Sequence, residues 1–213
     1  MGKYNATGGN NTSAWPETNR LESVNVKFLK EFIARPGTTG AIAPSSEFLA
    51  RMMLDDLALD AAAAVLEYGP GTGAFTEHIL RELKPDARYV AIELNPEFAR
   101  TFRSRFPRVA LFQDNVANAR AICDSAGIES ADCIVCGIPW AAFSESIQAK
   151  LLDEMMRVLR PGGRFVTFAY LHGLPLPTAK RFAALLPNYF SSVVRSPVVW
   201  KNIPPAFVYR CRR

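Results

Sequence analysis

One segment, VLEYGPGTG at positions 65–73, constrains the fold of this chain more than any other. Its apolar first half is typical of a buried strand, and a helical pattern begins soon after its last glycine. Gly69, Gly71 and Gly73 carry no side chain, so the backbone can turn sharply there and a ligand can approach the main chain closely. The segment therefore predicts a strand–loop–helix unit that binds a ligand at its loop.

The spacing of these glycines excludes two common phosphate-binding loops. The dinucleotide fingerprint is G-x-G-x-x-G, and the P-loop ends in Gly-Lys-Ser/Thr. This loop is G-x-G-x-G and follows the acidic Glu67. A ligand without a pyrophosphate fits it better.

Acidic residues also end the next two apolar runs. Glu93 closes the run at 88–93, where a carboxylate can accept hydrogen bonds from both ribose hydroxyls. Asp114 follows the run at 109–112, where it can accept from an adenine amino group while the next backbone N–H meets a ring nitrogen. Any one of these acids could merely cap a loop, but the ordered set favours a binding site.

In order and spacing, the residues over positions 65–116 resemble the motifs of class I S-adenosylmethionine-dependent methyltransferases. The resemblance implies S-adenosylmethionine as the cofactor, with Glu67 at its amino group. Further cofactor contacts are expected from Ser45, Tyr68, Asn115, Val116 and Gly137, in addition to the glycines and acids named above.

Length and composition predict one compact domain. A chain of 213 residues with 49% hydrophobic content can bury one large core. The net charge of +5 favours acidic partners without choosing between nucleic acid and an anionic membrane. Cys133 and Cys136 form a C-x-x-C inside an apparent strand with no second pair at zinc spacing, so we expect buried reduced thiols and no metal.

Strand and helix patterns alternate along the chain. They predict an α/β fold with a doubly wound, seven-stranded, mostly parallel sheet. The methyltransferase fold that the chain resembles is Rossmann-like, and its last strand is antiparallel. Helices are expected at 21–34, 45–58, 73–83, 96–106, 116–126, 144–159 and 177–186, and strands at 63–68, 88–93, 109–112, 132–136, 164–170, 191–200 and 206–212. Residues 1–19 should form a flexible arm, 20–60 an amphipathic helix and a lid helix, and 61–213 the methyltransferase core.

The acceptor site should lie where the fourth and fifth strands end, because open α/β sheets bind ligands outside the carboxyl ends of their strands. The fourth strand is followed by Gly137-Ile138-Pro139-Trp140. This run resembles the N-[IL]-P-[YFW] motif of methyltransferases that act on the adenine amine, with Gly137 in place of Asn. The missing amide weakens the adenine interpretation. Trp140 could form an aromatic wall for an amine, or it could anchor the following helix in the core.

Tyr170 and His172 follow the fifth strand. Imidazole suits proton removal from an amine at neutral pH, so His172 is a candidate base beside Tyr170 and Trp140. Methyl transfer to a neutral amine needs alignment more than acid–base catalysis, so the alternative is that no dedicated base exists.

Residues 21–35 have an apolar stripe that includes Phe28 and Phe32, with Lys27 and Lys30 on the opposite side. Such a helix is too short and too charged to span a bilayer, but it can lie in an anionic membrane surface. The alternative is that it packs on the domain's own core.

Three runs, at 28–46, 66–73 and 200–209, resemble bacterial phospholipid N-methyltransferases. The resemblance implies a peripheral enzyme on the cytoplasmic face of the membrane that methylates the head-group amine of phosphatidylethanolamine. Related bacterial enzymes act on ornithine lipids, and the same motifs would serve. An rRNA adenine N6-dimethyltransferase is a further alternative, opposed by Gly137 and by the lack of a helical RNA-binding extension, so no nucleic acid partner is expected. A cofactor-binding module without catalysis is the non-enzymatic alternative.

Overall fold

The computed structural model describes residues 46–213. The arm expected at 1–19, the amphipathic helix expected at 21–35 and Ser45 lie outside the described residues. No helix among the described residues is long and apolar enough to cross a bilayer.

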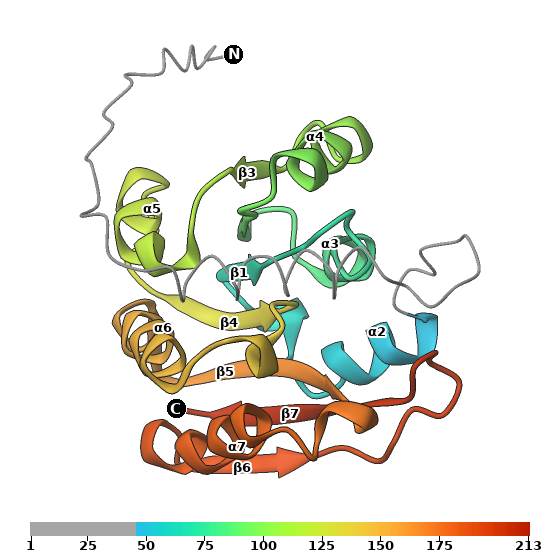
Figure 1. Cartoon of the computed structure of the whole chain (residues 1–213). Coiled ribbons are helices and arrows are strands. Elements are labelled where there is room, and N and C mark those ends of the chain that lie inside the picture. Colours follow the sequence, from blue (N-terminus) through green and yellow to red (C-terminus); the bar gives the residue numbers. More distant parts are fainter. Residues whose placement is uncertain (1–45) are drawn as a thin grey trace, which may run out of the picture.

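Seven strands form one sheet in the order β3-β2-β1-β4-β5-β7-β6 (Figure 1). Only β7 runs against its neighbours β5 and β6. The expected doubly wound sheet with an antiparallel last strand is therefore confirmed. The strands are β1 Ala64–Tyr68, β2 Arg88–Ile92, β3 Ala110–Phe112, β4 Ala131–Cys136, β5 Leu159–Tyr170, β6 Ser192–Arg195 and β7 Ala206–Arg212.

Helices connect the parallel strands. The α-helices are α2 Glu47–Leu54, α3 Thr76–Glu82, α4 Pro96–Arg105, α5 Ala119–Ser125, α6 Glu145–Val158 and α7 Pro177–Tyr189. Short 3-10 turns are η1 Leu59–Ala61, η2 Val116–Asn118, η3 Trp140–Ala142 and η4 Leu171–Gly173. Local sequence explains several helix starts: Asn95 caps α4 ahead of Pro96, and Ser144 caps α6.

The start of α3 and the end of β6 differ from the sequence prediction. Helix α3 begins at Thr76 and not at 73, because Gly73 has a left-handed φ of +89° and still belongs to the loop. Strand β6 ends at Arg195, and Val199 makes only one isolated bridge, to Ala206. Three prolines, at 197, 204 and 205, flank that bridge and have no N–H to continue a ladder.

The two faces of the sheet carry separate apolar clusters. Leu66 and Ile134 pack with α5, α6 and α7, while Val65 and Val135 pack with α2 and α3. Because successive strand residues point to opposite faces, each central strand contributes to both clusters. The carboxyl ends of β1, β2, β4 and β5 remain at one edge of the sheet, where the loops that carry the site begin.

Candidate functional site

The glycine loop leaves β1 through left-handed residues, with φ of +63° at Gly69 and +59° at Gly71. Gly71 is the open point of the loop: a Cβ added there would have no atom within 4 Å. The loop therefore presents bare main chain to a space that a ligand can occupy.

Gly137, at the end of β4, packs directly against this loop. Its N–H donates to the Tyr68 carbonyl at 2.7 Å. A Cβ at position 137 would lie 2.6 Å from the backbone oxygen of Gly69. No side chain fits in that gap, which gives a physical reason for glycine where the adenine-type motif has Asn.

Glu93 follows β2 and faces the loop, as its spacing predicts. One carboxylate oxygen accepts from the Gly71 N–H at 3.0 Å, and the other accepts from the Asn95 N–H at 2.8 Å. The residue is buried, and this desolvation raises the pKa of its carboxyl group. The Glu93 carboxyl group is thus fixed beside Gly71 as a hydrogen-bond acceptor.

Glu67 lies inside the sheet at the end of β1 and is fully buried. Its Oε2 accepts from the Thr76 hydroxyl at 2.7 Å and from the Tyr89 hydroxyl. Burial raises the pKa of Glu67 to about 7, and the two hydrogen bonds oppose that rise. The other oxygen, Oε1, is buried without a hydrogen-bond partner among the described residues.

Two partners of Glu67, Thr76 and Tyr89, were not predicted from the sequence. Tyr89 pairs with Val65 across the sheet, so its side chain lies on the same face as Glu67 one step away. The alternation of strand residues could have identified Tyr89, whereas Thr76 requires the placement of α3.

The side chain of Tyr68 points to the opposite face from Glu67. It is buried in the cluster with α5 and α6, and its hydroxyl has no hydrogen-bond partner among the described residues. Only the main chain of Tyr68 borders the glycine loop. Tyr68, which the sequence predicts as a cofactor contact, therefore presents its main chain and not its ring to the loop.

Asp114 and Asn115 follow β3, next to the end of β2. The two strand ends are joined by a hydrogen bond from the Glu93 N–H to the Phe112 carbonyl, at 3.0 Å. The Asp114 carboxylate accepts from the Asn115 N–H at 2.6 Å, and the Asn115 side chain caps η2. Val116 is half-buried and packs against the core. The structure therefore brings Asp114 to the same edge as Glu93 and the glycines.

Trp140 lies in the core. Its exposed fraction is 4%, and its ring stacks on Phe182 with centroids 4.5 Å apart. Edge contacts with Phe143 and Phe165 complete its surroundings. This placement corrects the expectation of an aromatic wall for the acceptor and favours the alternative of a core anchor.

Tyr170 and His172 lie at the end of β5, as expected. Their rings stack with centroids 5.5 Å apart and an interplanar angle of 14°. Tyr170 also makes an edge contact with Phe168, and burial raises the pKa of its hydroxyl. His172 is exposed on η4. The pair offers one ring face and one imidazole at the edge where Gly137 ends β4.

The loop before β7 is held against both η4 and α2. The Pro205 carbonyl accepts from the Leu171 N–H at 3.0 Å, in the turn that carries His172. Asn202 is buried, accepts from the Ser46 N–H at 2.9 Å and donates to the Pro204 carbonyl at 2.7 Å. The run at 200–209 contributes to the family resemblance, but no pattern in the sequence assigns this linking role to Asn202.

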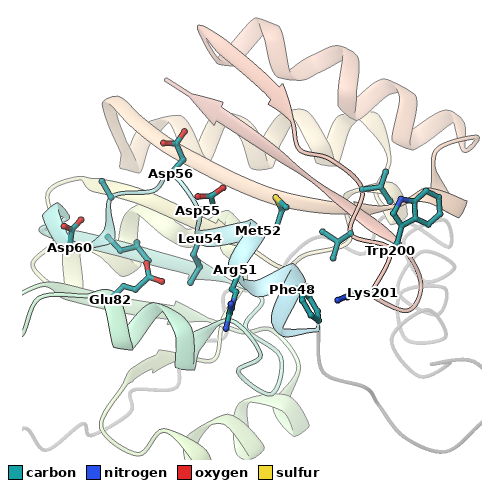
Figure 2. A pocket seen from close by; sticks show the side chains of 14 residues that line it. Phe48, Arg51, Met52, Leu54, Asp55, Asp56, Asp60, Glu82, Trp200 and Lys201 are labelled. Carbon is teal, nitrogen blue, oxygen red and sulfur yellow. The ribbon is translucent and has the colours of Figure 1, made fainter.

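A groove with a volume of about 940 Å³ runs beside α2 (Figure 2). None of the glycine-loop residues lines it. Its two ends differ in chemistry: Figure 2 shows Asp56 and Asp60 at one end and Phe48, Trp200 and Lys201 at the other. The groove is therefore separate from the glycine loop, and its aromatic end adjoins the loop before β7.

The four cysteines are free and buried. Cys133 and Cys136 belong to the clusters on opposite faces of the sheet, so their thiols cannot share a metal ion. Among residues 46–213, no three side chains of His, Cys, Asp or Glu gather as metal ligands.

Residues 65–163 match the family described as a methyltransferase domain. The ornithine lipid N-methyltransferase of Singulisphaera acidiphila is 31% identical over 188 residues, which cover 87% of this chain and 94% of that protein. Among solved structures, the O-methyltransferase from Bacillus cereus in complex with S-adenosylhomocysteine has a TM-score of 0.60 at 18% identity, covering 90% of this chain and 91% of that one. The O-methyltransferase TomG from Streptomyces achromogenes, in complex with S-adenosylmethionine, has a TM-score of 0.58 at 19% identity, covering 92% and 91%.

Proposed function

Because the chain belongs to the class I S-adenosylmethionine-dependent methyltransferases, we propose that it methylates the head-group amine of a membrane lipid, with ornithine lipid as the preferred acceptor. The observation that carries this proposal is the match to an ornithine lipid N-methyltransferase over 94% of that protein's length. Phosphatidylethanolamine, which the sequence motifs suggested first, becomes the second candidate.

S-adenosylmethionine is the cofactor, and the residues at the glycine loop fit its parts. Gly71 leaves open space beside Glu93, whose carboxylate can accept from the ribose hydroxyls. Asp114 suits the adenine amino group. The buried Oε1 of Glu67 has no described partner and suits a cationic amino group, which would favour the ionised carboxylate.

The bound cofactor supplies a methyl group on a positively charged sulfur. The task of the chain's own residues is to hold a neutral amine in line with that group, because alignment supplies most of the rate gain in such a transfer. We assign this task to the edge formed by Gly137, Tyr170 and His172. Either His172 or solvent removes the proton from the amine.

A lipid acceptor also requires the enzyme to reach a membrane surface. The lysines and apolar stripe of residues 21–35 support peripheral binding to an anionic bilayer. We propose that this attachment occurs at the inner face of the cell membrane.

One assay tests the proposed function directly. The protein and radiolabelled S-adenosylmethionine are incubated in parallel with vesicles that contain ornithine lipid, vesicles that contain phosphatidylethanolamine, and unmethylated rRNA. We expect label in ornithine lipid at the highest rate. Label in phosphatidylethanolamine alone would overturn the choice of acceptor, and label in rRNA alone would overturn a lipid function. Glu93→Ala is the control that separates enzymatic from background label.

A further inference from the structure

The loop between β6 and β7 exposes apolar side chains at its tip. Ile203 is 85% exposed and Trp200 is 71% exposed, while Phe48 at the start of α2 is 48% exposed. Figure 2 shows Trp200, Phe48 and the intervening Lys201 at one end of the groove. We call Phe48, Trp200, Lys201 and Ile203 the tip cluster.

The tip cluster is exposed on a loop that the fold holds in place. Asn202 lies between Lys201 and Ile203, is only 3% exposed, and ties the loop to the N–H of Ser46. The Val199 N–H donates to the Ala206 carbonyl at 2.7 Å, which closes the base of the loop. The apolar side chains are therefore presented to solvent by a fixed backbone.

The charge of the tip cluster is positive and uncompensated by a described acid. The Lys201 ammonium lies 4.4 Å from the centre of the Phe48 ring. Within residues 46–213, no carboxylate forms an ion pair with Lys201. A tryptophan and an isoleucine beside a lysine match the chemistry of a lipid interface, where indole and aliphatic groups enter and ammonium meets phosphate.

The tip cluster also adjoins the proposed acceptor segment. Pro205, two residues after Ile203, accepts from the Leu171 N–H beside His172. Ala206 pairs with Tyr170 at the end of β5. A surface that touched the tip cluster would thus lie against the edge where we place the lipid amine.

We infer that the tip cluster is a membrane-contact site that inserts Trp200 and Ile203 into the interface of an anionic bilayer, with Lys201 at the lipid phosphates. This inference rests on the proposed lipid function and adds a contact distinct from residues 21–35. It orients the protein so that the ends of β4 and β5 face the bilayer. The acidic end of the groove, with Asp56 and Asp60, is kept away from the anionic surface.

The test measures binding of the full chain to vesicles of phosphatidylcholine and phosphatidylglycerol, which carry no amine to methylate. Trp200→Glu combined with Ile203→Glu should reduce the partition coefficient about ten-fold or more. Lys201→Glu should reduce it about three-fold or more at low salt and much less at high salt.

Matched controls make the same chemical changes elsewhere. Val194→Glu alters an exposed apolar residue on β6, and Lys84→Glu reverses an exposed charge in the turn before β2, at the opposite edge of the sheet. Both should bind vesicles like the wild type. Equal losses in the controls and in the tip variants would overturn the inference, because they would reflect charge alone.

Fluorescence supplies a second reading that does not depend on a disruptive variant. The chain has three tryptophans, and Trp200→Phe removes one while it keeps an aromatic side chain. Vesicles should blue-shift the wild-type emission, and the shift should be largely lost in Trp200→Phe although binding persists. The inference would be overturned if vesicles did not shift the wild-type emission and Trp200 were already shielded from acrylamide quenching without vesicles. Another part of the chain or a second copy would then cover Trp200.

The binding test is independent of catalysis. If ornithine lipid is methylated but the tip variants bind vesicles normally, the inference fails and the proposed function stands. If the tip variants lose binding but no lipid is labelled by the wild type, the contact site stands and the proposed function fails.

Discussion

The carboxyl edge of the sheet has two halves that are built in different ways. The cofactor half, at the ends of β1, β2 and β3, places Glu67, Glu93 and Asp114 around a bare glycine loop. The acceptor half, at the ends of β4 and β5, depends on contacts between segments far apart in the chain. Asn202 and Ser46, for example, are 156 positions apart. The comparison shows that binding chemistry can be local in sequence while the surface that meets the acceptor is assembled only by folding.

Two tryptophans, one following β4 and one on the loop before β7, give the sharpest test of that comparison. Trp140 is buried against Phe182, whereas Trp200 is 71% exposed. Trp140→Ala should lower the free energy of unfolding by about 3 to 5 kcal/mol, because a large core side chain is lost and a cavity is left. Trp200→Ala should change it by less than about 0.5 kcal/mol.

Urea unfolding of both variants measures this difference. The outcome that would break the assignment is a Trp140→Ala protein as stable as the wild type that has lost only turnover. Trp140 would then belong to the acceptor surface and not to the core.

Glu67 tests the cofactor half through its pKa. The carboxyl titrates at about 7 in the folded protein and near 4.5 when unfolded, so the folded state binds more protons between these values. Stability should therefore fall as the pH rises from about 4.5 to 7, by about 3 kcal/mol for a shift of this size. Glu67→Gln should remove that contribution to the slope.

Unfolding free energies of wild type and Glu67→Gln at pH 5 and pH 8, without cofactor, measure the effect. Parallel curves for the two proteins would show that Glu67 is ionised in the native state throughout. A second measurement is proton release: cofactor binding near pH 6 should release a proton from the wild type, and Glu67→Gln should not.

Glu93 should affect binding more than folding. Its carboxylate faces the open point of the loop, so Glu93→Ala should weaken S-adenosylmethionine binding by about 1.5 to 3 kcal/mol, which is roughly ten-fold or more. Glu77→Ala, on the exposed face of α3, is the matched control and should leave affinity unchanged. Calorimetry that gave equal affinities for the two variants would remove Glu93 from the cofactor site.

The sequence predicted the cofactor half better than the acceptor half for a physical reason. Parallel strands bring residues at their carboxyl ends to one edge, so Glu93 and Asp114 could be placed from the order of strands alone. The packing of Gly137 on Gly69 could not be foreseen, because it depends on how closely two loops approach: a Cβ at position 137 would lie 2.6 Å from the Gly69 oxygen. Trp140 was misplaced, because an aromatic residue near a strand end has the same pattern whether it faces a ligand or the core.

Boundaries were missed where backbone geometry overrides periodicity. Residues 73–75 fit a helical pattern, but the left-handed φ of Gly73 delays α3 until Thr76. The apolar pattern of 191–200 fits one long strand, yet β6 ends at Arg195 and leaves Trp200 on the loop. That early end creates the tip cluster, which no periodicity argument would have revealed.

The smallest expected effect concerns His172, and it tests whether the acceptor half contributes acid–base chemistry at all. The chain has only two histidines, so His78 on α3 provides a matched control. If His172 removes the amine proton, His172→Ala should lower the maximal rate about ten-fold. This loss is smaller than is usual for a general base, because alignment dominates methyl transfer. Cofactor affinity should be unchanged in both variants, and His78→Ala should keep the wild-type rate. Steady-state rates with ornithine lipid vesicles check this, and a full rate in His172→Ala would leave proton removal to solvent before the amine binds.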